Sequence, residues 1–244
     1  MMEKYLARER RRDQERSLEE RKIFSRKFDL HQYFSPASRN TQRFIHHNKS
    51  EGYSMVHNAV EMSGDPKTLV VAVHGACPHN GSPLVTKSSF GLFFGEGSNL
   101  NMYEQISRPA GQVHTNSHAE LMAVYHALHL IDDSSLLDKW RARNGEILTA
   151  IIMTDSAYVY DIFTTWIWEW RDSNFTASNT YPAADRAWIE RIDKLIEDLK
   201  NRNIHIRFWS VPREDIEGAD KLANAALVDG PIGVQGEPFI GDIY

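Results

Sequence analysis

One segment of this sequence constrains the fold more than any other, because it joins an apolar strand to a carboxylate and then to a helix. Residues 148–159 read LTAIIMTDSAYV: apolar and β-branched residues run up to Asp155, and a helical pattern follows at once. Proteins of the α/β class place their chemistry at the carboxyl ends of such buried strands. Asp155 is therefore the first candidate functional residue.

Hydrophobic periodicity predicts how the rest of the chain is arranged around this strand. Helices are predicted behind a cap at residues 115–117 and over residues 183–199, where apolar residues recur three and four apart. Strands are predicted at residues 67–73, 89–94, 103–108, 147–154 and 204–211. The first three strands lie close together in the chain, which indicates an antiparallel meander. The last two follow helical patterns, which indicates parallel crossovers.

Two further carboxylates lie at the starts of predicted helices. Glu120 belongs to HTNSHAELMAVYHAL (residues 114–128), and Asp220 belongs to ADKLANAAL (residues 219–227). Clustered carboxylates on separate elements are what phosphodiester cleavage by two divalent ions requires, and oxygen donors without thiolates favour Mg²⁺ or Mn²⁺. Taken singly, each has a structural explanation: Asp155 and Asp220 are acceptable helix caps, and Glu120 is an acceptable surface charge.

Taken together, TNSHAEL, TDSAYV and ADKLA resemble the ribonuclease H family, which carries T-N-x-x-A-E-L, T-D-S-x-Y-V and A-D-x-L-A in this order. The resemblance covers about residues 69–228. It implies an α/β, ribonuclease H-like fold with a five-stranded mixed sheet flanked by helices. It also implies an endonuclease that hydrolyses the RNA strand of RNA/DNA hybrids by a two-metal carboxylate mechanism. Glu120, Asp155 and Asp220 are the expected catalytic metal ligands, with His74 at the fourth position, where it is expected to weaken the activity.

His74 is the main departure from the family pattern. The first strand of family members ends in Asp-Gly, and this Asp is the fourth acidic metal ligand of the family. This chain has AVHGACPHNG (residues 72–81), with His74 at the position of that Asp. Neutral imidazole suits Mg²⁺ poorly and does not bridge two ions. Three outcomes stay open: a silent domain, a weakened site that uses one ion, and a site retuned toward Mn²⁺ or another metal that accepts imidazole. A second departure is the connection at residues 211–220. Many family members have a longer loop there with a histidine that assists proton transfer or product release, and this chain has no histidine in the connection.

The resemblance also implies where the substrate is held. The segment TTWIWEWRDSNFTAS (residues 164–178) matches the family segment that grips the DNA strand of a hybrid. Trp170, which is flanked by charged residues, is expected at the surface, whereas Trp166 fits a core position equally well. The predicted nucleic-acid contacts are Asn80, Thr115, Asn116, Trp166, Trp170, Phe175 and Ser178. Thr115 and Asn116 have a capping role as an alternative, and Asn80 an ordinary turn role.

Composition and charge bound the remaining possibilities. Residues 1–66 are predicted to be a charged extension, partly helical or mobile, residues 67–229 the ribonuclease H-like domain, and residues 230–244 a tail. The net charge is −5, and beyond residue 30 it is 18 basic minus 26 acidic residues, or −8, so bulk charge does not favour nucleic acid.

The single cysteine, the charged start and the lack of a long apolar run favour an intracellular protein, cytoplasmic or nuclear. The expected partner is an RNA/DNA hybrid or other nucleic acid, without a membrane. The charged segment of residues 1–27 is a candidate docking element for a protein. The competing function is a catalytically silent domain of the same fold that binds nucleic acid or a protein.

Overall fold

The computed structural model describes most of residues 26–229. The described ranges are 26–30, 41–58, 62–80, 82, 85–108, 112–133, 135–138, 140, 147–173, 175 and 184–229. The predicted docking element at residues 1–27 lies almost wholly outside these ranges, as do Ser178 and the predicted tail. Within the described ranges, no helix is both long enough and apolar enough to cross a membrane.

The five predicted strands form the centre of a mixed sheet, which confirms the predicted topology. β4 (Thr68–Ala76), β5 (Ser89–Phe93) and β6 (Met102–Gln105) are antiparallel neighbours. β7 (Leu148–Thr154) runs parallel to β4, and β8 (Ile204–Ser210) runs parallel to β7. Parallel pairing brings the carboxyl ends of β4 and β7 to the same edge of the sheet.

Within the described ranges, three further strands enlarge this sheet to eight, three more than the sequence predicted. A 3₁₀ turn, η2 (Thr41–Phe44), leads into β1 (Ile45–Asn48), which pairs antiparallel with β2 (Tyr53–Asn58). β2 pairs with β4 and with the short β3 (Ser63–Gly64). The region before residue 67 therefore contributes strands to the sheet that carries the candidate site.

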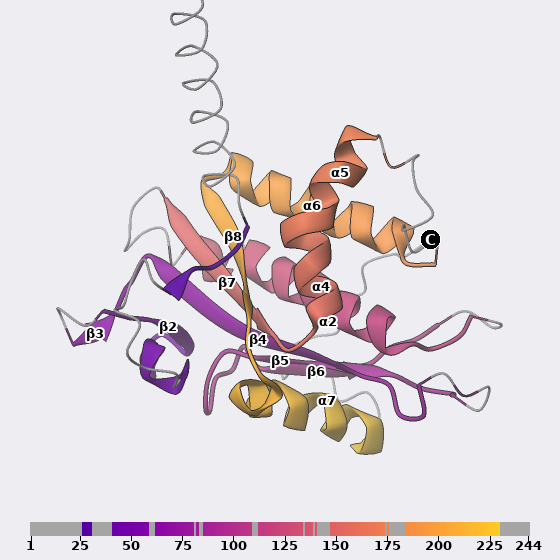
Figure 1. Cartoon of the computed structure of the whole chain (residues 1–244). Helices are drawn as coiled ribbons and strands as arrows, with labels where there is room; N and C mark the ends of the chain where they lie inside the picture. The colour runs from indigo at the N-terminus through magenta and orange to yellow at the C-terminus, as the bar shows by residue number, and fades with distance from the viewer. Residues whose placement is uncertain are drawn as a thin grey trace, which may run out of the picture.

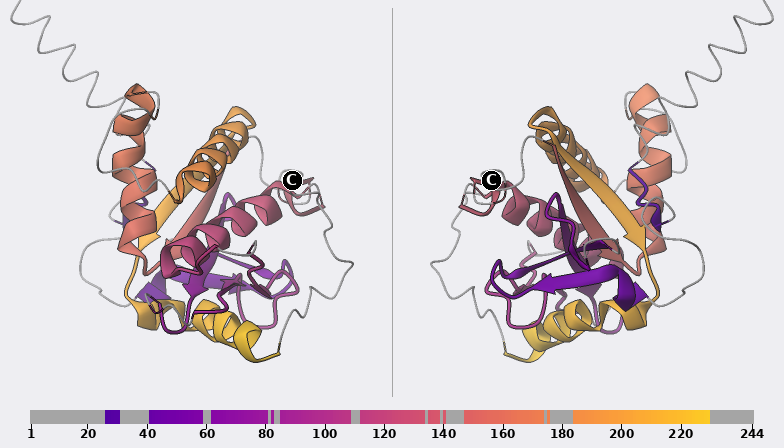
Figure 2. Two further views of the ribbon diagram at one scale, coloured as in Figure 1. Left: turned by 90° about the vertical axis from the view of Figure 1, so that its right-hand side faces the viewer. Right: turned by 90° about the vertical axis from the view of Figure 1, so that its left-hand side faces the viewer.

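Helices cover both faces of the sheet (Figure 1). α2 (Asn116–Asp132) and α6 (Arg186–Asn201) lie on one face, together with a continuous helical stretch. That stretch consists of α4 (Ala157–Asp161), the π-helical η3 (Ile162–Trp166) and α5 (Ile167–Asp172). On the other face, the 3₁₀ turn η4 (Arg213–Ile216) leads into α7 (Glu217–Asp229). The side views in Figure 2 show α7, in yellow, alone beneath the sheet.

Side-chain alternation along β4 explains why both faces need a cover. Leu69 and Val71 belong to the main core, together with Leu121 and Val124 of α2. The intervening Val70 and Ala72 belong to a second core with Ile216 and Ala219 of the η4–α7 side. Because successive side chains of a strand point to opposite faces, His74 follows Val70 and Ala72 onto the α7 face. The fold thereby directs His74 toward the helix that carries Asp220.

Candidate active site

His74 lies between two of the predicted carboxylates. Its Nδ1 atom is 3.2 Å from Oδ1 of Asp155, and its Nε2 atom is 3.3 Å from Oδ1 of Asp220. His74 comes from the end of β4, Asp155 directly follows β7, and Asp220 belongs to the first turn of α7. The His74 side chain is buried, whereas both carboxylates remain partly exposed. The structure thus brings together three residues that are far apart in the sequence.

Glu120 is held beside this group by two donors. The amide of Asn116 donates to Oε1 of Glu120 over 2.8 Å, one turn earlier on α2. The Ser156 hydroxyl donates to Oε2 and also accepts a hydrogen bond from Val159 N, so it caps α4. Ser156 therefore links the helix that follows Asp155 to the Glu120 carboxylate. Sequence reasoning assigned no role to Ser156, although its place directly after Asp155 in the TDS motif was a signal.

The pKa values of Glu120 and Asp155 are shifted in opposite directions. Burial and the neighbouring Asp155 charge raise the pKa of Glu120, although the Ser156 hydrogen bond and His74 act to lower it. Burial also acts to raise the pKa of Asp155. The hydrogen bond and the charge of His74 outweigh this effect, so the pKa of Asp155 is lowered. The site therefore holds one carboxylate that is easily charged and one whose charge is costly.

Asp220 has a second cationic neighbour. The Arg213 guanidinium of η4 donates to Oδ1 of Asp220, the same oxygen that faces His74. Arg213 is largely exposed, so solvent screens this ion pair. It stands in the connection where the family's histidine is missing. The sequence did not single out Arg213, although it lies within the connection at residues 211–220 that departs from the family pattern.

The donor set fits a divalent ion only in part. Glu120, Asp155 and Asp220 supply oxygen atoms from three elements, which suits Mg²⁺ or Mn²⁺. Within the described part of the chain, however, no group of three or more His, Cys, Asp and Glu side chains is arranged to hold a metal ion. Asp155 and Asp220 would have to exchange contacts with His74 and Arg213 for contacts with an ion. Two ions bridged at position 74 do not fit, because imidazole cannot bridge them.

The predicted contacts at the start of α2 lie beside the carboxylates. Thr115 caps the helix by accepting a hydrogen bond from His118 N over 3.1 Å, so the capping alternative is correct for this residue. Asn80 accepts a hydrogen bond from Asn116 N over 3.0 Å and is exposed. Together these bonds tie the turn after β4 to the helix that carries Glu120.

The two predicted tryptophans differ sharply in exposure. Trp166 is 38% exposed, whereas Trp170 is 2% exposed, so the prediction of a surface position for Trp170 is wrong. Trp170 continues a buried row with Phe163 and Ile167 at positions i, i+4 and i+7, and this helical periodicity outweighs its charged neighbours. Phe175 is half-buried and packs against the same core. Of the predicted aromatic contacts, Trp166 is the most exposed among the described residues.

Comparison with known proteins gives a consistent result. The family model described as RNase H matches residues 66–228. A ribonuclease H of Schizosaccharomyces pombe is 30% identical over 157 residues, which cover 63% of this chain and 51% of that protein. A ribonuclease H of Crithidia fasciculata is 23% identical over 169 residues, 62% of this chain and 33% of that protein. The matches therefore span from one third to about half of these two relatives.

Two solved structures are similar to part of this chain. One is LC11-RNase H1 in complex with an RNA/DNA hybrid, with a TM-score of 0.42 and 16% identity over 64% of this chain and 94% of that chain. The other is RNase H1 from Halobacterium salinarum NRC-1, with a TM-score of 0.40 and 20% identity over 67% of this chain and 99% of that chain.

Proposed function

Because the chain belongs to the ribonuclease H family, we propose that it is a metal-dependent endonuclease that hydrolyses the RNA strand of RNA/DNA hybrids, weakened by His74. The observation that carries this proposal is the convergence of Glu120, Asp155 and Asp220 around one strand edge. Mutually repelling carboxylates are costly to hold together, and a domain without chemistry has no physical need for them.

Glu120, Asp155 and Asp220 would hold Mg²⁺ or Mn²⁺, with His74 at the compromised fourth position. A bound ion supplies charge stabilisation at the scissile phosphate. Ser156 and Asn116 fix both oxygens of Glu120, so that this carboxylate is oriented before substrate arrives. Because His74 occupies the space between Asp155 and Asp220, the geometry favours one ion over the two-ion arrangement of the family.

The substrate would lie across the start of α2 and the outer side of η3. Asn80 and Asn116 present polar groups next to Glu120, and Trp166 offers an exposed ring for stacking on a base or sugar. Trp170 supports the Trp166 ring from below, since their ring centroids are 5.9 Å apart. Thr115, Phe175 and Ser178 stay proposals as contacts, with Ser178 outside the described residues.

A second candidate is a catalytically silent module that keeps the fold to bind nucleic acid or a protein. The observation in its favour is that both ring nitrogens of His74 face carboxylates and that Arg213 bonds Asp220. These contacts reduce the repulsion between the acidic residues without an ion. In this alternative, His74 and Arg213 replace the metal as the electrostatic partner of the site.

Two proposals concern the chain outside this site. The charged segment of residues 1–27 is a proposed docking element for a protein partner, and residues 67–229 are the proposed catalytic domain. An intracellular compartment, cytoplasmic or nuclear, is proposed because Cys77 is the only cysteine of the chain.

The decisive experiment is cleavage of an end-labelled RNA/DNA hybrid in Mg²⁺ and, separately, in Mn²⁺. Three proteins are compared: the natural chain, Asp155→Asn and His74→Asp. Circular dichroism checks that all three are folded to the same extent. Cleavage by the natural chain that Asp155→Asn abolishes supports the weakened nuclease. We expect His74→Asp to cleave faster by about 10- to 100-fold, the range over which altered metal surroundings change activity. If only His74→Asp cleaves, the silent module is correct.

A further inference from the structure

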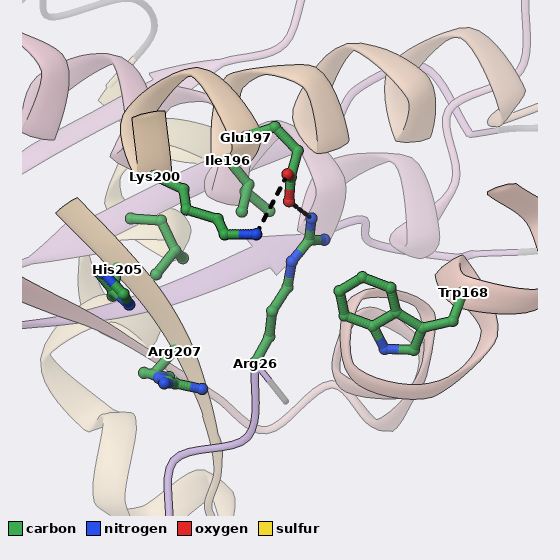
Figure 3. Close-up of a pocket in the computed structure, with 8 residues that line it drawn as sticks. Arg26, Trp168, Ile196, Glu197, Lys200, His205 and Arg207 are labelled. Atoms are coloured by element: carbon green, nitrogen blue, oxygen red, sulfur yellow. Dashed lines mark hydrogen bonds and ion pairs between the residues drawn. The ribbon is translucent and has the colours of Figure 1, made fainter. Parts of the chain in front are cut away.

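A small cationic cavity lies on the outer edge of β8, away from the carboxylate group. Figure 3 shows Arg26, Lys200, His205 and Arg207 around it, with Glu197 bonded to Arg26 and to Lys200. Its enclosed volume is about 30 Å³, and it opens to solvent. That volume exceeds the roughly 10–15 Å³ that a cavity needs to hold one water molecule. It therefore admits the leading oxygens of a small anion, with the rest of the ligand outside.

The segment of residues 26–30 completes the cavity by pairing with β8. Phe28 N donates to Phe208 O over 2.8 Å, and Phe208 N donates to Arg26 O over 2.7 Å, so Lys27 lies beside Phe208 in a parallel bridge. The Phe28 ring packs against Trp209 at a centroid distance of 5.1 Å. This pairing brings the Arg26 side chain, which is 4% exposed, to α6.

Cations outnumber anions around the cavity. Nη2 of Arg26 donates to Asp193 over 2.7 Å and to Glu197 over 3.0 Å. Arg171 also bonds Asp193, and its guanidinium and that of Arg26 flank the Trp168 ring at 5.1 and 5.0 Å. Among the described residues that line the cavity, three cations face one anion, a balance of +2: Arg26, Lys200 and Arg207, with Glu197.

Two local features mark this excess of positive charge. Nη1 of Arg26 is buried and has no hydrogen-bond acceptor within the described residues. A buried charged donor without an acceptor is costly, and a nearby anion would lower that cost. Burial, Arg207 and Lys200 together lower the pKa of His205. Both features indicate an excess of positive charge at this cavity, although the chain as a whole has a negative net charge.

We propose that this cavity binds a phosphate group, either as inorganic phosphate or as a phosphate of a nucleic acid. Lys200 and Arg207 approach it from α6 and β8, with Arg26 on the docked segment. A phosphate has acceptor oxygens on several sides, which suits donors converging from three elements, whereas one arginine fork satisfies a carboxylate. The site is separate from the carboxylate group, and the proposal does not depend on nuclease activity.

The first experiment titrates inorganic phosphate into the full-length protein at constant ionic strength, with acetate and chloride as comparison anions. Backbone amide shifts are followed by NMR. We expect phosphate-specific shifts at Lys200 and at residues 205–208, and the double variant Lys200→Gln/Arg207→Gln should weaken binding about tenfold or more. Lys221→Gln, on exposed α7, is the matched control and should leave binding unchanged.

One further variant distinguishes a specific effect on phosphate binding from a loss of structure. Glu197→Gln removes an anion from the cavity wall and should tighten phosphate binding, a gain that misfolding cannot produce. Absence of shifts at residues 205–208, equal shifts with acetate, or unchanged binding in the double variant would overturn the proposal.

A second arm identifies the source of the phosphate. Binding of a fluorescent RNA/DNA hybrid is measured by anisotropy over a range of salt concentrations. Each phosphate contact contributes about 0.9 to the slope of log affinity against log salt. If the slope falls by about 1 in the double variant, the phosphate belongs to the nucleic acid. If the slope is unchanged while inorganic phosphate still binds the natural chain, the ligand is a free phosphate. Hybrid cleavage is scored separately, so failure of the nuclease proposal does not affect this result.

Discussion

Gly75 lies directly against the backbone of Glu120. A Cβ atom at Gly75 would meet Glu120 N at 2.2 Å and Ala119 C at 2.3 Å, distances that real Cβ atoms do not show. The residue after His74 thus allows β4 to approach α2 closely enough to place Glu120 beside the strand edge. The glycine of the VHG sequence has a packing role that no other residue can fill without moving the helix.

Gly75→Ala should therefore destabilise the protein by about 3 kcal/mol or more, because rigid backbone atoms cannot yield to the new methyl group. Urea unfolding measures the loss. Gly218→Ala is the matched control, since the nearest atoms to its Cβ all belong to the Phe93 ring, a side chain that can turn, and its loss should be smaller. Equal losses at the two positions would contradict this reading of the contact between β4 and α2.

Trp166 and Trp170 should separate binding from stability. Trp166→Ala removes an exposed ring and should weaken hybrid binding by about 1–3 kcal/mol, the range for base–aromatic stacking, with little change in unfolding. Trp170→Ala empties a buried position and should cost about 3–5 kcal/mol of stability. Anisotropy with a labelled hybrid and urea unfolding measure the two quantities. Unchanged affinity in Trp166→Ala would remove this residue from the proposed substrate surface.

Asp193 should be a strong determinant of stability. It accepts hydrogen bonds from Arg26 and from Nε and Nη2 of Arg171, and it is largely buried. Asp193→Ala removes the more buried of the two carboxylates that these guanidinium groups share and leaves only Glu197, so it should cost about 3–5 kcal/mol. Glu190→Ala, which breaks the exposed pair with Arg186, should cost less than about 1 kcal/mol. Chemical denaturation of both variants tests the contrast.

Acid should destabilise the protein through buried histidines. Burial and then His129 lower the pKa of His126 to about 4, and burial, Arg108 and His114 lower that of His118 to about 4. Between about pH 6.5 and pH 4 the unfolded chain binds more protons than the folded one, so the free energy of unfolding falls as pH falls.

The variant that tests this is His126→Gln. It should show a shallower loss of the free energy of unfolding between pH 7 and pH 4.5 than the natural chain, measured by urea unfolding at each pH. A loss of the same size in the variant would mean that His126 does not contribute to the acid sensitivity.

Local pattern in the sequence was sufficient for the central strands and for the acidic residues. Apolar runs ending in turn residues predicted β4, β5, β7 and β8 to within a few residues, since β4, β5 and β7 are buried on both faces and β8 alternates buried and half-buried residues. The three carboxylates were selected because motif order fixes them relative to those strands. The strands before residue 67 were missed, because β2 meets β4 at a single registered pair and its sequence carries weak alternation.

What the sequence by itself determined is the family, the topology of the central sheet and the identity of the acidic residues. Tertiary structure alone decided which atoms face one another: His74 toward Asp155 and Asp220, and Ser156 toward Glu120. It also brought Arg26 to α6, across 167 residues of chain. Periodicity fixes a residue's face on its own element, but contact between elements depends on packing distances and on competition among charged partners, which are properties of the folded chain as a whole.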